Sequence, residues 1–248
     1  MNAEIVRFDE LESTNTTLKD HADGPDGLTY VASFQTGGRG QRGNSWESKA
    51  GKNLLFSMLL HPRTITPARG FELSMVVSLA IVKALSLHGV EARIKWPNDI
   101  YAGGDRKICG ILIEHTISGG AIESSIVGVG LNVNQKEFIS DAPNPVSMIN
   151  LLGRETELNA ILEDVTREML EGFKTYEQAP DFDGLMQAYR MALWRGDGAA
   201  YRFREAATGE IFEARIGDIS ADGTLSLVAE GADGAIRNYQ FKEVEFLL

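Results

Sequence analysis

The chain has 248 residues, 43% of them apolar, which suits one large domain with a small appendage, or two domains. With 24 Lys and Arg against 35 Asp and Glu, its net charge of −11 disfavours a broadly basic nucleic-acid surface and leaves room for a local basic patch. The single cysteine excludes an internal disulfide. Together with the lack of a signal core or an 18-residue apolar run, it predicts a soluble cytoplasmic protein.

The first elements are short and separated by polar turns. Residues 3–8 alternate between apolar and polar side chains and predict a strand. The Ser-Thr-Asn triplet at 13–15 offers side-chain oxygens that can cap a helix at residues 16–22. Residues 28–34 predict a second strand, and residues 54–60, apolar on both faces, predict a central one.

A glycine-rich, basic segment joins these last two strands. It begins QTGGRGQRG at Gln35 and continues through Trp46 to residue 53. Glycines let backbone N–H groups converge on an anion, and an arginine adds a planar fork for carboxylate or phosphate oxygens. We therefore predict a mobile anion-binding loop. The alternative is a flexible surface turn whose arginines only keep it soluble.

Two familiar phosphate-binding motifs do not fit this segment. Residues 38–43 match G-x-G-x-x-G, but that motif needs a helix after it, and residues 44–51 have no helical apolar period. The spacing also fits the start of a P-loop, yet Asn44 and Ser45 stand where Lys and Ser or Thr are required. The loop is therefore neither a dinucleotide motif nor a P-loop.

The middle of the chain predicts a helix followed by strands. An apolar stripe predicts a helix at 71–88, and residues 92–96 predict a strand that ends in a Pro-Asn-Asp turn. Residues 107–114 and 124–132 predict a pair of strands around a glycine turn. Residues 134–145 are polar, contain two prolines and predict a flexible loop.

Towards its end, the sequence pattern changes from helices to short strands. Two amphipathic helices are expected at 158–176 and 184–194. From residue 200 onward, short alternating runs are separated by Thr-Gly and Asp-Gly dipeptides, which are typical of hairpins. We therefore predict a small β-barrel of about 50 residues at the end of the chain.

Several polar or reactive residues lie at the ends of predicted strands, where a sheet can position them. Lys107 at a strand mouth can neutralise phosphate or carboxylate charge, or it can be an edge lysine. Asp99 can stabilise its turn, and Trp46 can stack on a ligand ring or pack within its loop. Cys109 fits a small buried residue better than a catalytic thiol, and the histidines show no metal spacing. These residues favour chemistry on a phosphate or an activated acyl group and do not name the substrate.

Five motifs in one order resemble the biotin–protein ligases. They are STN at 13–15, QTGGRGQRG at 35–43, KWPND at 95–99, RKICGILIE at 106–114 and GVGLN at 128–132. The resemblance implies an α+β fold, with a mixed sheet and flanking helices as in class II aminoacyl-tRNA synthetases. It places this catalytic domain at residues 1–196 and an SH3-like β-barrel at 197–248. Because the chain starts directly at the catalytic domain, we expect a ligase without the DNA-binding winged helix of some relatives, and so no repressor.

The resemblance also implies a reaction and a set of site residues. Biotin and ATP would form biotinyl-5'-AMP with Mg²⁺, and biotin would then pass to one lysine of a biotin carboxyl carrier protein. Lys107 and Arg39 would be catalytic, and residues 134–145 would close over the adenine. The biotin-binding residues would be Ser13, Thr14, Asn15, Gln35, Gly38, Arg39, Gly40, Gln41, Lys107, Gly110 and Ile111. The residues that contact nucleotide or metal would be Arg42, Trp46, Asn98, Asp99 and Asn132.

One position departs from the pattern, and two alternative functions remain. Many relatives carry an arginine where this chain has Gln41, which makes the loop less positive and leaves open how firmly the adenylate is held. A lipoate–protein ligase or octanoyltransferase shares the catalytic fold. A non-enzymatic anion-binding or nucleic-acid module is a different class, which the acidic composition disfavours. We expect no DNA or membrane partner, no structural metal, and a monomer or a homodimer.

Overall fold

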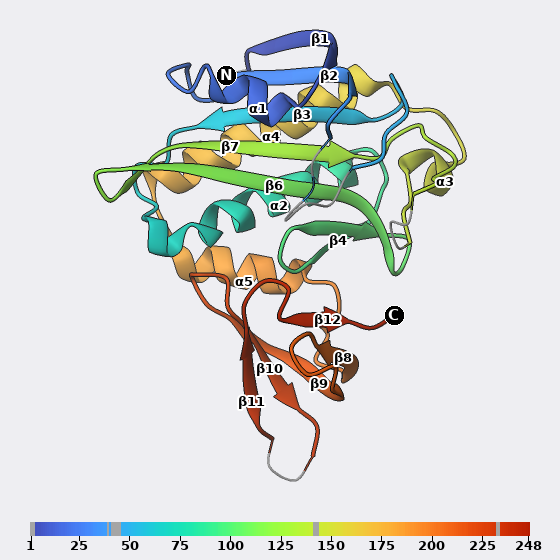
Figure 1. The fold of residues 1–248 in the computed structure, drawn as a ribbon. Helices are drawn as coiled ribbons and strands as arrows, with labels where there is room; N and C mark the ends of the chain where they lie inside the picture. Colours follow the sequence, from blue (N-terminus) through green and yellow to red (C-terminus); the bar gives the residue numbers. More distant parts are fainter. Residues whose placement is uncertain (1–2, 39, 41–45, 141–143, 232–233) are drawn as a thin grey trace.

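A computed structural model describes residues 3–38, 40, 46–140, 144–231 and 234–248. A seven-stranded mixed sheet with helices forms the larger part of the molecule, and a five-stranded antiparallel sheet forms the smaller part (Figure 1). The α+β class and the β-rich end that the sequence predicts are thus confirmed.

The large sheet has the strand order β1-β2-β3-β7-β6-β5-β4. Its strands are β1 (Ile5–Leu11), β2 (Thr29–Gln35), β3 (Leu54–Leu60), β4 (Ala92–Lys95), β5 (Asp99–Ala102), β6 (Arg106–Ser118) and β7 (Ala121–Leu131). Only β1 and β2 pair in parallel, and the remaining neighbours are antiparallel. Among the residues described between β2 and β3 there is no helix, which agrees with the exclusion of a dinucleotide motif.

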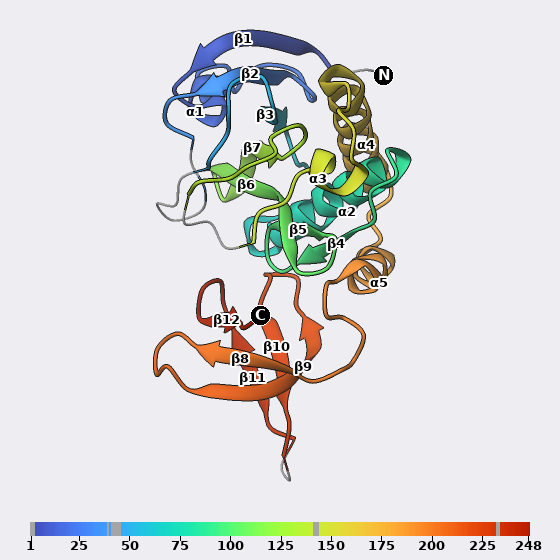
Figure 2. The same cartoon turned by 90° about the vertical axis from the view of Figure 1, so that its right-hand side faces the viewer.

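The two faces of the large sheet are covered differently. The short helix α1 (Thr14–Lys19) packs on β2, β3 and β7 on one face, whereas α2 (Phe71–Leu87) and α4 (Leu158–Gln178) lie against the other (Figure 2). Every residue of β3 is buried, because the strand is covered on both faces. This double cover explains the continuous apolar run that predicts a central strand.

The sequence predicts most elements to within a few residues and misses several short ones, among them the 3-10 helix η2 (Pro67–Arg69). The others are β5, the helix α3 (Met148–Leu152) and the terminal strand β12 (Val244–Phe246). Each has only three to five residues, which is too few for a hydrophobic period to be recognised. The helix α5 (Phe182–Ala192) follows α4, close to the predicted position.

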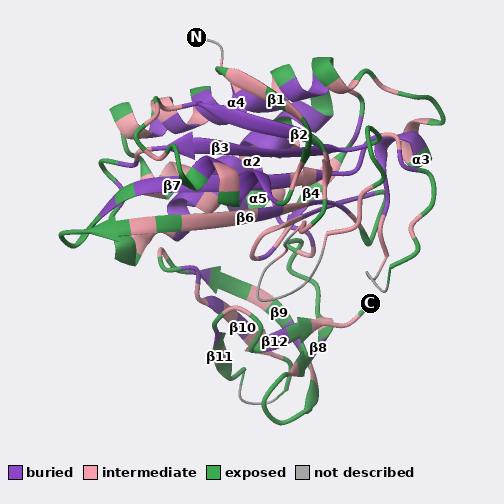
Figure 3. Cartoon of the chain, turned by 45° about the horizontal axis from the view of Figure 1, so that its top comes forward, coloured by how far each residue is buried: buried purple, intermediate pink, exposed green. Residues whose placement is uncertain are grey.

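The smaller sheet has the strand order β11-β10-β9-β8-β12. Its other strands are β8 (Tyr201–Glu205), β9 (Ile211–Ile219), β10 (Leu225–Ala229) and β11 (Ile236–Tyr239). The described residues show no pairing between the two outer strands, so the expected barrel is a barrel-like sheet that is not closed. Buried residues are concentrated in the large sheet and its helices, whereas exposed residues prevail in the smaller sheet (Figure 3).

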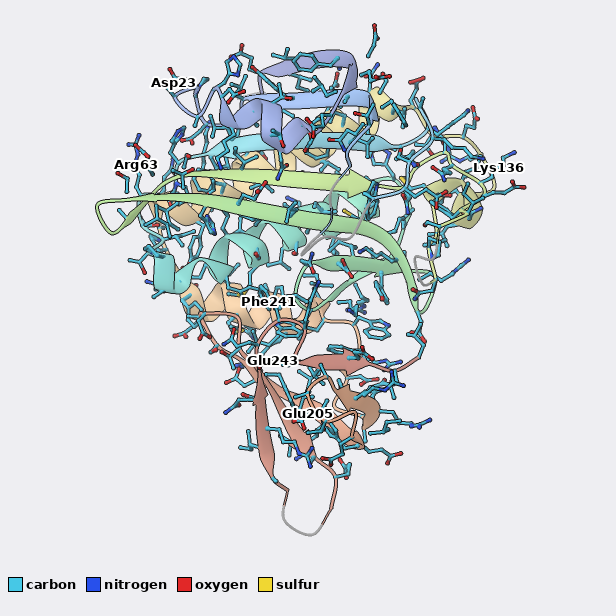
Figure 4. The ribbon with its side chains drawn as sticks, viewed as in Figure 1. Asp23, Arg63, Lys136, Glu205, Phe241 and Glu243 are labelled. Atoms are coloured by element: carbon cyan, nitrogen blue, oxygen red, sulfur yellow. The ribbon has the colours of Figure 1, made fainter. Side chains whose placement is uncertain are left out.

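Aromatic side chains join the two parts of the molecule. The indole N–H of Trp96 donates to the carbonyl of Gly223 at 2.9 Å, and its ring lies 5.4 Å from the ring of Phe241. Phe241 also contacts Phe71 at the start of α2, and it lies where the smaller sheet meets the helices (Figure 4). Trp96 belongs to the KWPND segment, so this segment is fixed to the smaller sheet on one side.

Candidate active site

One cavity on the α1 face of the large sheet gathers most of the predicted site residues. The predicted residues that line it are Ser13, Thr14, Asn15, Gln35, Gly40, Trp46, Asn98, Lys107, Gly110 and Ile111. The wall is completed by residues for which the sequence predicts no role: Leu55, Phe56, Leu112, Gly128, Val129 and Gly130. Segments that are far apart in the sequence therefore meet at one place, because neighbouring strands bring them there.

Three described residues with predicted roles, Gly38, Asp99 and Asn132, are not part of the cavity lining. Gly38 accepts a hydrogen bond from the backbone N–H of Trp46 at 3.1 Å, and Asp99 contacts Lys107. Asn132 is buried, and its side-chain amide donates to the carbonyl of Val146 at 3.1 Å. Three further predictions, Arg39, Gln41 and Arg42, fall outside the described residues.

The start of α1 presents its polar side chains to the cavity. Ser13 is the N-cap, as predicted, and its hydroxyl accepts from the backbone N–H of Thr16. The backbone N–H of Thr14 donates to Oε1 of Gln35 at 2.6 Å, and the Thr14 hydroxyl lies 3.1 Å from the same oxygen. The helix cap and the end of β2 are thus joined, and one side of the Gln35 amide is fixed.

A buried polar group lies behind these residues. The hydroxyl of Ser57 is 2.5 Å from Oδ1 of Asn15 and 2.7 Å from the hydroxyl of Thr14. The amide nitrogen of Asn15 donates to a carboxylate oxygen of Glu114 at 2.7 Å and to the carbonyl of Leu112 at 3.4 Å. Protein atoms therefore contact both ends of the Asn15 amide. The sequence gives no sign of this group, because Ser57 lies within an otherwise apolar strand.

Glycines on β7 and β6 make room for two of these side chains. A Cβ atom on Gly128 would lie 2.2 Å from Oδ1 of Asn15, so only glycine fits beneath that amide. Cβ atoms on Gly130 and Gly110 would lie 2.5 and 2.9 Å from ring atoms of Trp46. The indole therefore lies flat over the sheet, and its buried N–H has no hydrogen-bond partner within the described part of the chain.

Lys107, which lines the cavity, belongs to a charged cluster with Asp99 and Lys95. Nζ of Lys107 is 2.7 Å from the Asp99 carboxylate and 5.4 Å from the centre of the Trp46 ring. Nζ of Lys95 is 3.9 Å from the same carboxylate, and burial lowers the pKa of this lysine. The Asp99 carboxylate thus contacts two lysines, of which Lys107 faces the cavity and suits an anion.

The KWPND segment is fixed on the cavity side as well. The side-chain amide of Asn98 donates to the carbonyl of Ile111 at 2.8 Å, and the backbone N–H of Ile111 donates to the carbonyl of Asn98 at 2.9 Å. Because Trp96 is hydrogen-bonded to Gly223, this segment connects the smaller sheet to the side of the cavity that Lys107 lines.

The loop that carries Trp46 is held by a second loop. Glu47 accepts from the backbone N–H groups of Ile139 and Ser140, with distances of 2.8–3.1 Å. Desolvation raises the pKa of its carboxyl, but hydrogen bonds from the Ser140 side chain and from these backbone groups lower it overall. Gln135 accepts from the backbone of Lys49 and from Asn53, both at 2.8 Å. Sequence reasoning missed Glu47 and Gln135. Both are polar residues in polar loops, where nothing distinguishes them from solvated side chains.

The structure also bears on the predictions about Cys109, a metal site and a membrane span. Cys109 is fully buried, as predicted, and burial raises the pKa of its thiol. Within the described residues, no group of three His, Cys, Asp or Glu side chains could hold a metal ion. No helix in this part of the chain is long and apolar enough to span a bilayer.

The fold and the cavity define a class, the proteins with a biotin ligase-like fold. A biotin protein ligase from Aquifex aeolicus, solved with biotin and ATP, superposes with a TM-score of 0.78 at 24% identity, over 98% of this chain and 97% of that one. A biotin protein ligase from Leishmania major, in complex with biotinyl-5-AMP, gives 0.65 at 18% identity, over 96% and 98%. The chain belongs to the Biotin/lipoate A/B protein ligase family, whose model matches residues 8–132, about half of its length.

Curated relatives agree with this assignment. The chain is 40% identical to a biotin–[acetyl-CoA-carboxylase] ligase of Paracoccus denitrificans, over 49% of this chain and 51% of that protein. It is 32% identical to the bifunctional ligase/repressor BirA of Escherichia coli, over 68% and 53%. With the Bacillus subtilis BirA it shares 34% identity, over 55% and 42%. The matched region thus spans about half the length of these relatives.

Proposed function

We propose that this chain is a biotin–protein ligase that acts in the cytoplasm on a biotin carboxyl carrier protein. The observation that carries the proposal is the cavity itself, which holds Thr14 and Gln35 in one space with Lys107. Thr14 and Gln35 suit the N–H and C=O groups of a cyclic urea, and Lys107 suits an anion. Relatives named as biotin ligases, and the fold shared with ligases solved with biotin and ATP, support it.

In the proposed first step, a biotin carboxylate oxygen attacks the α-phosphorus of ATP, and diphosphate leaves. Lys107 holds the two approaching anions together, because its ammonium group offsets charge that accumulates between them. Asp99 keeps this ammonium group in place through their 2.7 Å contact. In the second step, a lysine amine of the carrier attacks the acyl carbon, and AMP leaves.

We assign the remaining site residues to a biotin end and a nucleotide end of the cavity. Ser13, Asn15, Gly110 and Ile111 would line the biotin end of the cavity. Trp46 and Asn98 would contact the nucleotide. Asn132, which is bonded to Val146, would contribute to the same end. Gly38 and Gly40 belong to the loop for which we propose closure over the adenylate, with Arg39, Gln41 and Arg42. Magnesium would enter with the nucleotide, where it screens phosphate charge.

The proposal extends to the organisation of the chain. Residues 1–196 would be the catalytic domain and residues 197–248 the SH3-like one. The contacts of Trp96 with Gly223 and Phe241 support a working connection between them. We propose no DNA and no membrane partner, and an enzyme that works as a monomer or a homodimer.

The test is diphosphate release by the purified chain with ATP and Mg²⁺ and one acid at a time. Biotin should support turnover, whereas lipoate and octanoate should not. Transfer of biotin to a purified carrier domain should follow and should disappear when the acceptor lysine is replaced by arginine. Turnover with lipoate or octanoate, but not with biotin, would overturn the assignment.

Replacing Cys109 with serine should leave the rate of biotin activation within about threefold of wild type, because the proposed reaction does not use the thiol. A threefold change corresponds to about 0.65 kcal/mol of activation free energy. The thiol is fully buried and burial raises its pKa, so it is a poor nucleophile. Diphosphate release measured beside circular dichroism separates activity from folding. A folded but inactive Cys109→Ser enzyme would favour an octanoyltransferase-type thiol mechanism.

A further inference from the structure

A line of hydrogen-bonding side chains runs behind the cavity from β6 to the cap of α1. It connects Glu114 to Asn15 at 2.7 Å, Asn15 to Ser57 at 2.5 Å, and Ser57 to Thr14 at 2.7 Å. Asn15, Ser57 and Thr14 are buried, so water does not compete for these contacts. Only Thr14 and Asn15 of the four line the cavity, which places Glu114 and Ser57 behind it.

The direction of proton donation along this line is determined at its Glu114 end. A carboxylate only accepts, and so does the Leu112 carbonyl, so the end of the Asn15 amide that faces them must be the nitrogen. The Asn15 oxygen then faces Ser57, which must donate its single proton to it. The close contact between the two hydroxyls therefore needs the proton of Thr14, which donates to Ser57.

This direction decides what the cavity offers a ligand. With its proton directed to Ser57, the Thr14 oxygen keeps lone pairs and is an acceptor. Oε1 of Gln35 already accepts the backbone N–H of Thr14 at 2.6 Å, so the Gln35 nitrogen remains as a donor. The 3.1 Å contact between the Thr14 hydroxyl and Oε1 is then left without a proton. One acceptor beside one donor complements the N–H and C=O of a cyclic urea.

We propose that Glu114 and Ser57 are positioning residues that fix this acceptor-and-donor pair and so set the specificity for the ureido ring. The proposal rests on the proposed biotin ligase function and deepens it. Neither residue touches the ligand, since both act through Asn15 and Thr14. Their effect should therefore appear in the recognition of ureido N–H groups and not in ATP binding.

The experiment compares variants with ligand analogues by titration calorimetry. The variants are Glu114→Ala, Glu114→Gln and Ser57→Ala, with Glu123→Ala as a matched control on the exposed side of β7. The ligands are biotin and its two analogues methylated on one ureido nitrogen. The wild type should bind one analogue at least about tenfold more weakly than biotin, which corresponds to about 1.4 kcal/mol for a lost hydrogen bond.

Glu114→Ala leaves Asn15 only the long contact to Leu112, so the hydrogen-bond line can reverse. Affinity for biotin should fall about tenfold, and the penalty for methylation should shrink to below about threefold, because Thr14 can then donate. Ser57→Ala, which removes the acceptor of that proton, should shrink the penalty too. Glu114→Gln should retain both values, since its amide oxygen can accept from Asn15. The KM for ATP and the properties of Glu123→Ala should be unchanged.

Two results would overturn the inference. One is wild-type biotin affinity in Glu114→Ala. The other is a loss of affinity with an undiminished methylation penalty in both Glu114→Ala and Ser57→Ala, which is the result of a merely structural role. A wild-type chain that binds no biotin would overturn the proposed function and the inference with it. A wild type that binds biotin beside unaffected variants overturns the inference alone.

Discussion

Replacing Lys107 with alanine is expected to lower the rate of biotinyl-adenylate formation by about 100-fold or more, while the fold is retained. A single well-placed group that offsets developing charge typically contributes about 100- to 1,000-fold to such a rate. Lys107 lines the cavity, and its only ion pair among the described residues is with Asp99. Without it, the biotin carboxylate and the α-phosphate would approach each other beside an unpaired carboxylate, which repels both.

Single-turnover diphosphate release with saturating biotin and ATP measures this effect. The side chain of Lys107 is 29% exposed, so its removal leaves no large hole in the core, and circular dichroism should be unchanged. Lys19→Ala is a suitable control, because Lys19 is an exposed lysine at the end of α1. An activity of Lys107→Ala within a factor of two of wild type would remove this lysine from the chemistry.

Replacing Gly128 or Gly130 with alanine should impair different substrates, although the two glycines are neighbours on one face of β7. A Cβ on Gly128 would lie 2.2 Å from the Asn15 amide oxygen, and one on Gly130 would lie 2.5 Å from the Trp46 ring. Overpacking of this kind typically costs about 1–3 kcal/mol. Gly128→Ala should therefore weaken biotin binding by about 10- to 100-fold, because it displaces the side chain that orders Ser57 and Thr14.

Gly130→Ala should instead weaken nucleotide binding, since it displaces the indole proposed to contact it. Separate titrations with biotin and with a non-hydrolysable ATP analogue distinguish the two variants. Chemical denaturation reports the cost to the fold, which should be larger for Gly128→Ala, because Asn15 is buried and bonded at both ends. Equal losses for both ligands in both variants would mean that the glycines only support the sheet.

Much of the candidate site could be anticipated because its residues lie at the ends of helices and strands that the sequence pattern predicts. Ser13 caps α1, Gln35 ends β2 and Lys107 begins β6 beside Arg106, so local patterns predict where they lie in these elements. Their proposed roles come from the resemblance to the biotin–protein ligases. Residues such as Glu47 and Gln135 could not be found in this way. Their importance comes from contacts with backbone groups 86 and 92 positions away, and local sequence carries no information about such pairs.

The sequence by itself determined most of the strands and helices and the motifs that line the cavity, because hydrophobic period, caps and turn residues act over a few neighbouring positions. Only the tertiary structure decided how these pieces cooperate. Ser57 is one polar residue in an apolar strand, and it becomes a hydrogen-bond partner of Asn15 because β3 and α1 pack together 42 positions apart. Such contacts depend on strand order and register, which arise from the packing of the whole sheet and not from any one segment.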